Sequence, residues 1–162
     1  MKKIFFAALM MIICLPAFAK KAKKKTKHPK ATTGIQSILM FKTNCYGHCP
    51  VYNIKVENNG MVTYDGQANV ADSGIYTKNV GATKAMDIIN KLTSHKVDTC
   101  HNFYESKTPD LPGINYMVQY KDSTKRISNA NWGPQFLREV AGDIDELGKV
   151  HDSSWKKAKK GK

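Results

Sequence analysis

The sequence predicts an α+β fold, an antiparallel sheet with two helices packed on one face. Short segments alternate apolar and polar residues as strands do, and two longer segments repeat apolar residues every three or four positions. In chain order these segments give β-β-β-β-α-β-β-α. Strands grouped ahead of each helix are typical of the α+β class, and we place this single domain at residues 35–155.

The first two strands are expected at residues 35–43 and 51–57. The apolar run at 38–41 suits a strand buried on both faces, although its periodicity also fits a buried helical turn. The second segment alternates cleanly, so that one face carries Tyr52, Ile54 and Val56.

A turn at residues 58–60 leads into a third strand at 61–66. A three-residue loop with Gly60 in the left-handed conformation pairs Val56 with Val62 and Ile54 with Tyr64, whereas a two-residue turn sets Val56 against Thr63. We favour the first register because it keeps the apolar face continuous. A weaker fourth strand follows at 75–80.

The two helices are expected after Gly81 and after Gly133. Thr83 is the expected cap of the first helix, whose apolar positions are Ala85, Ile88, Ile89 and Leu92. The second helix has Pro134 at its first position and buries Phe136 or Leu137, Val140, Ala141, Ile144 and Leu147, leaving Asp143, Asp145 and Glu146 in solvent. Between the helices, strands are expected at 114–120 and 124–131.

Residues 1–19 are typical of a secretory signal peptide. They combine a basic start, an apolar run and the small-x-small ending Ala17-Phe18-Ala19, so we expect cleavage after Ala19. The apolar run falls short of the ~20 residues that a spanning helix needs, and no transmembrane segment is expected after cleavage. A lipid anchor on Cys14 is the alternative, which Ile13 disfavours. The protein is therefore expected in the periplasm or outside the cell.

The net charge of +13 comes from the two ends of the chain. A lysine-rich arm at 20–34 and a lysine-rich tail at 156–162 flank a nearly neutral domain, and we expect both ends to be disordered. Such ends keep a protein soluble and can make weak contact with anionic surfaces. Neither contains arginine or an aromatic residue, so sequence-specific nucleic-acid binding is not expected.

The candidate site is the segment 44–52 between the first two strands. Gly47 permits a positive φ and Pro50 fixes φ, so Cys45 and Cys49 lie on a constrained turn. Because exported thiols are normally oxidised, we favour a disulfide between these two cysteines, with Cys100 left free. The loop side chains are then a candidate binding site, made of Tyr46, Gly47, His48 and Pro50.

Two alternatives use the same cysteines. A thiol-redox pair usually has two intervening residues at a helix N-terminus, whereas three intervene here and a strand follows. A zinc site would draw on Cys45, His48, Cys49, Cys100 and His101, although two of its ligand pairs are adjacent in sequence. We expect no cofactor and no catalytic residue. Cys100 alone suits a small buried apolar residue, and His95, His101 and His151 are most simply solvated.

The motif Cys45-Tyr46-Gly47-His48-Cys49-Pro50-Val51-Tyr52, followed by an alternating strand and the Asn59-Gly60 turn, resembles an uncharacterised family of exported bacterial proteins, a domain of unknown function. The recurring pattern is C-[FY]-G-x-C-P-x-Y. The likeness continues through Tyr104, Thr108-Pro109-Asp110, the last two strands, Ile144-Asp145 and Trp155, and so spans 35–155. Cys100 is not part of the pattern, and the resemblance implies no activity.

The function expected from these observations is that of a non-enzymatic envelope module. It would bind an envelope protein or ligand through the loop that the Cys45–Cys49 disulfide closes. A thiol-redox or zinc-dependent activity is the alternative from a different class.

Overall fold

The computed structural model describes residues 34–106, 108, 111–150 and 153–158. Its elements are β1 (Ile35–Lys42), β2 (Val51–Glu57), β3 (Met61–Ala68), β4 (Gly74–Asn79), α1 (Ala82–Ser94), the 3-10 helix η1 (Val97–Thr99), β5 (Ile114–Tyr120), β6 (Thr124–Ile127), the 3-10 helix η2 (Ala130–Trp132), α2 (Gln135–Leu147) and β7 (Lys156–Lys157).

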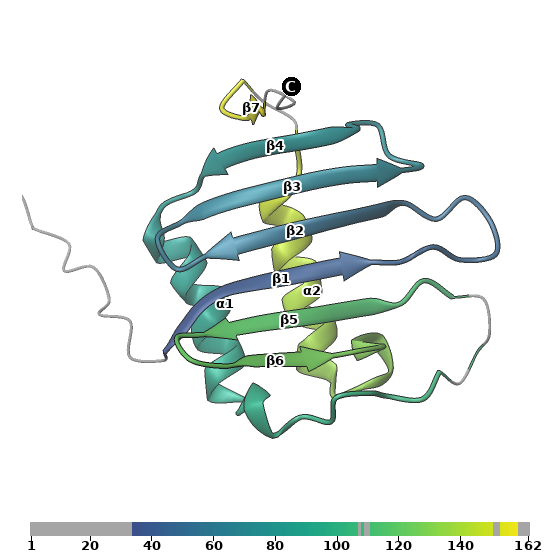
Figure 1. The fold of residues 1–162 in the computed structure, drawn as a ribbon, viewed down its shortest axis with the longest axis vertical. Helices are drawn as coiled ribbons and strands as arrows, with labels where there is room; N and C mark the ends of the chain where they lie inside the picture. The colour runs from purple at the N-terminus through teal and green to yellow at the C-terminus, as the bar shows by residue number, and fades with distance from the viewer. Residues whose placement is uncertain (1–33, 107, 109–110, 151–152, 159–162) are drawn as a thin grey trace, which may run out of the picture.

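The strands form one seven-stranded sheet in the order β6-β5-β1-β2-β3-β4-β7. Every neighbouring pair is antiparallel. Helices α1 and α2 lie side by side behind the sheet, on the same face (Figure 1). The predicted α+β class, antiparallel sheet and two helices are confirmed. Among the described helices, none is long and apolar enough to cross a membrane.

The core lies between the helices and the covered face of the sheet. Because successive side chains of a strand point to opposite faces, every second residue of the central strands meets the helices. Burying one large aliphatic side chain there stabilises the fold by about 1.5–3 kcal/mol. The fully buried side chains include Ile38, Met40, Ile54, Val56, Val62, Val118, Ile89, Leu92, Leu137, Val140 and Ile144.

Strand β1 differs from the prediction in one respect. It was expected to be buried on both faces, but its buried residues are Ile35, Ile38 and Met40, while Leu39 and Phe41 are half-buried. The reason is that both helices cover the same face, so the second face of β1 has no layer above it.

The hairpin register is the predicted one. Val56 pairs with Val62 and Ile54 with Tyr64, and Gly60 has a φ of 93°. A Cβ on Gly60 would lie 2.4 Å from the backbone carbon of Gly81. Glycine is therefore required at this position for two reasons: the turn needs a positive φ, and the chain that starts α1 approaches too closely for a side chain.

Three local predictions were wrong. Thr83 lies inside α1, whose capping position is Gly81, and the Gly81 amide donates instead to the Asn79 side chain over 2.8 Å. Pro134 is the capping residue of α2 rather than its first helical residue. The sixth strand ends at Ile127 rather than at residue 131, because Asn129 takes a positive φ of 54° and the chain turns into η2.

The C-terminal segment is more ordered than its lysine content suggests. Lys156 and Lys157, expected at the start of a disordered tail, form β7 and pair with β4. The preceding Trp155 is buried, and its indole N–H donates to the Lys149 carbonyl over 2.8 Å. Packing of this tryptophan holds the lysines that follow against the sheet edge. The expected signal peptide, residues 20–33 of the arm, His151, and residues 159–162 of the tail lie outside the described residues.

Candidate functional site

The disulfide loop, residues 43–50, joins β1 to β2. Cys45 and Cys49 are bonded, with their Cα atoms 5.7 Å apart, and Cys100 is free. The favoured disulfide is thus the one that forms. Both ends of the loop are also fixed by hydrogen bonds, because the Thr43 amide donates to the Gly113 carbonyl over 3.1 Å and the Asn69 side chain donates to the Cys49 carbonyl over 3.2 Å.

The tip of the disulfide loop points its side chains into solvent. Tyr46 is 91% exposed, more than any other large hydrophobic side chain of the described residues. Gly47, His48 and Pro50 are exposed as well, whereas the two cysteines are half-buried. The loop therefore holds an aromatic ring away from the domain on a covalently closed base.

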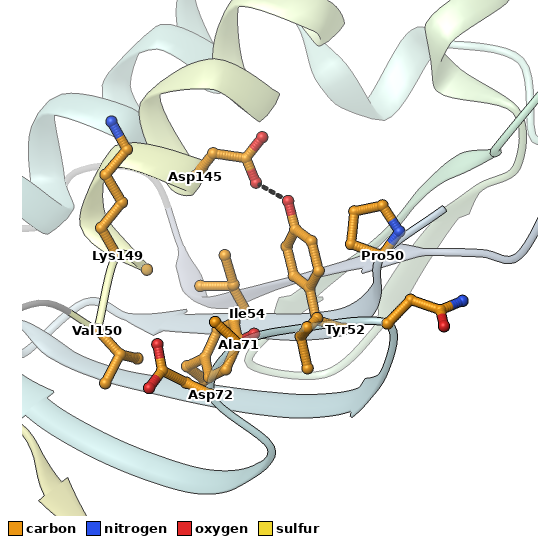
Figure 2. Close-up of a pocket in the computed structure, with 12 residues that line it drawn as sticks. Pro50, Tyr52, Ile54, Ala71, Asp72, Asp145, Lys149 and Val150 are labelled. Atoms are coloured by element: carbon orange, nitrogen blue, oxygen red, sulfur yellow. Dashed lines mark hydrogen bonds between the residues drawn. The ribbon is translucent and has the colours of Figure 1, made fainter. Parts of the chain in front are cut away.

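A cavity of about 370 Å³ opens beside this loop, and we call it the tyrosine pocket (Figure 2). Its walls come from three parts of the chain: the start of the β2–β3 hairpin, the connection between β3 and β4, and the end of α2 with the residues after it. The lining residues are Pro50, Tyr52, Ile54, Tyr64, Asn69, Val70, Ala71, Asp72, Asp145, Gly148, Lys149 and Val150.

Asp145 joins the end of α2 to the sheet at one wall of the tyrosine pocket. One carboxylate oxygen accepts from the Tyr52 hydroxyl over 2.7 Å, as Figure 2 shows, and the other accepts from the Lys42 ammonium over 2.5 Å. The same ammonium lies 5.3 Å from the centre of the Tyr52 ring. Burial, and after it the hydrogen bond to Asp145, raises the pKa of Tyr52.

The position of Asp145 corrects the expectation that it faces solvent. Lys42 and Tyr52 are directly paired across β1 and β2, and both continue the helix-facing side of their strands. A lysine and a tyrosine at such positions need polar partners, since unpaired groups are costly to bury. The need of Lys42 and Tyr52 for a polar partner could therefore have indicated an inward-facing acidic residue, and Asp145 is among the few acidic residues at the end of α2.

Three tyrosines form a row along the helix-facing side of the sheet. The ring centres of Tyr52 and Tyr64 are 5.7 Å apart, and those of Tyr64 and Tyr76 are 6.4 Å apart. Burial raises the pKa of Tyr64, and the nearby carboxylates of Asp72 and Asp65 raise it further. At the far end of the row, the Lys157 ammonium lies 5.2 Å from the centre of the Tyr76 ring. No motif in the sequence marks Tyr64, Tyr76 or Asp72 as site residues.

The alternative zinc ligands are not brought together. Two of them are joined in the disulfide, and the described part of the chain contains no group of three or more His, Cys, Asp or Glu side chains suited to a metal ion. Cys100 is half-buried beside Tyr104, whose pKa is raised by burial and by its hydrogen bond with the Cys100 side chain.

The histidines of the described chain are exposed, and two of them contact aromatic rings. His101 meets the Tyr104 ring edge-on at 5.8 Å, and His95 stacks on Phe136 at 4.6 Å. These contacts are local packing at the surface, away from the disulfide loop.

Comparison with protein families finds a match over most of the domain. The model described as "Domain of unknown function (DUF6438)" matches residues 36–148, a span that includes the disulfide loop, the strands β2 to β6 and both helices. No curated protein matches the sequence. The match agrees with the expected resemblance to an uncharacterised domain family, while the eight-residue motif at 45–52 stays a prediction.

Proposed function

Because this chain belongs to the DUF6438 family, whose function is unknown, its role must be argued from its own surfaces, and we propose that it is a non-enzymatic binding module of the bacterial envelope. The disulfide loop is the part that engages a partner, an envelope protein or ligand. The observation that carries this proposal is the 91% exposure of Tyr46 on a loop whose base is closed by a disulfide.

An exposed aromatic residue on a fixed loop suits recognition for two reasons. Tyrosine is enriched among the residues that contribute most to binding at protein interfaces. A loop held in one shape loses little further freedom when it binds, so less of the contact energy is offset by ordering.

A second exposed apolar side chain lies at the same end of the sheet. The Thr43–Gly113 hydrogen bond places the chain before β5 next to the disulfide loop, and there Leu111 is 52% exposed. In Figure 1 the start of β5 and the β1–β2 loop lie at the same end of the sheet. Tyr46 with Leu111 therefore gives a partner two apolar contacts on neighbouring loops.

Export is part of the proposal. It is supported by the signal-peptide pattern of residues 1–19 and agrees with the disulfide, which persists in oxidising compartments. The mature chain should then begin at Lys20, which mass spectrometry of the secreted or periplasmic protein measures. Retention of residues 1–19, or a lipid mass on Cys14, would refute this step.

A photo-crosslinking experiment tests the binding role. A photoreactive phenylalanine analogue replaces Tyr46 in the full chain, which is produced in the source bacterium so that its envelope partners are present. The matched control carries the analogue at Lys121, an exposed residue in the β5–β6 turn. Because β5 runs antiparallel to β1, that turn lies at the opposite end of the sheet. We expect a discrete adduct from position 46 and none of the same mass from position 121.

Competition makes the crosslinking result specific. Excess unlabelled wild type should suppress the adduct, and the Tyr46→Ala variant should not, although its thermal midpoint should match that of wild type. Equal adducts from both positions, or equal competition by Tyr46→Ala, would contradict the proposal. Thiol titration with and without reductant, together with a zinc assay, addresses the rival class: a rapidly reacting native Cys45 thiolate or bound zinc would favour it.

A further inference from the structure

We propose that the tyrosine pocket binds a small organic cation, an ammonium group held against tyrosine rings beside the carboxylate of Asp72. This site is separate from the Tyr46 contact and does not depend on the function proposed for the disulfide loop. Three features indicate this class of ligand. Lysine ammonium groups already lie over two rings of the tyrosine row, the third ring has no such group among the described residues, and the carboxylate of Asp72 lines the pocket.

The protein binds two of its own lysine ammonium groups on this row of tyrosines. The Lys42 ammonium lies over Tyr52 and the Lys157 ammonium lies over Tyr76, at 5.3 Å and 5.2 Å from the ring centres. A cation within about 6 Å of a ring centre is attracted by the negative face of the ring. The outer tyrosines of the row are thus both occupied as cation sites.

The middle of the row is where the pocket opens. Among the described residues, no lysine or arginine is placed over Tyr64, the ring between the two occupied ones. Lys42 comes from β1 and Tyr64 from β3, on opposite sides of β2, and both Tyr52 and Tyr64 line the pocket. The pocket therefore exposes parts of the Tyr52 and Tyr64 side chains to a ligand beside Asp72.

The charges facing the pocket favour a cation over an anion. Asp145 is already paired with Lys42 and Tyr52, whereas Asp72 has no ion pair within the described chain. The one lysine of the lining, Lys149, turns its ammonium away from the pocket toward Glu146 (Figure 2). A carboxylate without a basic partner beside apolar walls is the environment that an organic ammonium ion complements, because such an ion supplies both charge and apolar surface.

The volume of the tyrosine pocket limits the ligand to a small one. A cavity of 370 Å³ has room for about twelve non-hydrogen atoms, taking ~30 Å³ as the share of one water molecule. Choline, with its quaternary ammonium and short polar arm, is within that limit and is the probe we would use.

The test compares choline with 3,3-dimethylbutan-1-ol, a neutral molecule of nearly the same shape, by NMR titration of the wild-type chain. Saturable shifts of the amides of Ala71, Asp72 and Val150 with choline, and at least tenfold weaker binding of the alcohol, are expected. Equal binding of the two probes, or shifts with choline that do not saturate or are spread over acidic residues elsewhere, would overturn the proposal. This comparison needs no variant.

A pair of surface variants sharpens the result. Asp72→Asn should weaken choline binding at least fivefold, while Asp122→Asn, an exposed aspartate in the β5–β6 turn, should leave it unchanged. Unchanged affinity in Asp72→Asn at an unchanged thermal midpoint would refute the role of that carboxylate and the proposal with it. Tyr46→Ala should bind choline as wild type does, so the failure of one proposal is distinguishable from the failure of the other.

Discussion

Replacing Asp145 by asparagine should destabilise the fold far more than the same change at the next residue. The Asp145 carboxylate pairs with Lys42, and the two side chains are only 27% and 22% exposed. It also accepts the Tyr52 hydroxyl over 2.7 Å. Asparagine keeps an oxygen for that hydroxyl but removes the negative charge, which leaves the half-buried ammonium of Lys42 without its partner.

The magnitude follows from these contacts. Hydrogen bonds to charged groups contribute about 1.5–3 kcal/mol, and we expect Asp145→Asn to lower the free energy of unfolding by that amount. Glu146 is 68% exposed and pairs with Lys149 at the surface. Exposed pairs of this kind contribute about 0–1 kcal/mol, so Glu146→Gln should have little effect.

A double-mutant cycle in urea measures the effect. Asp145→Asn, Lys42→Met and the double variant are unfolded under identical conditions, and the coupling between the two sites should exceed about 1 kcal/mol, within the range for residues in contact. Similar losses for Asp145→Asn and Glu146→Gln, or a coupling near zero, would show that the link between α2 and the sheet is not what stabilises this end of the fold.

Three further outcomes are expected. The pKa of Tyr52 is raised in the fold, so the stability that its neutral form provides is present below the ordinary pKa of about 10 and declines as the pH rises above it. Tyr52→Phe should reduce this loss of stability between pH 8 and pH 11, measured by urea unfolding at both pH values. An equal loss in wild type and variant would contradict the role of Tyr52. Gly60→Ala should lower the thermal midpoint more than Gly81→Ala. Both glycines have a positive φ, 93° and 86°, but only at Gly60 would the new Cβ meet backbone atoms. Equal midpoints of the two variants would refute this. Ending the chain after Ala158 should leave the free energy of unfolding unchanged. Ending it before Trp155 should lower that free energy by about 3–5 kcal/mol in urea unfolding, as removal of other large buried aromatic side chains does. Equal stability of the two truncated chains would show that the tryptophan is not part of the core.

Much of the fold was predictable because the strands obey a simple periodicity. The choice of Val62 rather than Thr63 as the partner of Val56 rested on keeping one face apolar, and the structure has that register. The buried stripes of both helices follow the expected spacing, except that Leu147 is only half-buried and Met86 is an additional buried residue of α1. These features depend on residues close in sequence, which is why pattern alone determines them.

The tyrosine pocket was not predictable in the same way. It depends on where the end of α2 lies relative to β2, which brings Asp145 to a lysine and a tyrosine about a hundred residues earlier in the chain. It depends also on the β3–β4 connection, whose small and polar residues carry no periodicity. The lysine-rich composition around residue 156 likewise concealed the packing of Trp155, which is a property of tertiary structure.

The two lysines of β7 have a consequence for how the sheet behaves at high protein concentration. An exposed edge strand offers unpaired backbone groups to another chain, and short, cationic edges discourage such pairing. One edge of this sheet ends in Lys156 and Lys157, and the other ends in the four residues of β6, which include Lys125 and Arg126. A second copy that docked edge to edge would bring like charges together along a strand too short to offset their repulsion, so growth of the sheet from one molecule to the next is opposed at both of its edges.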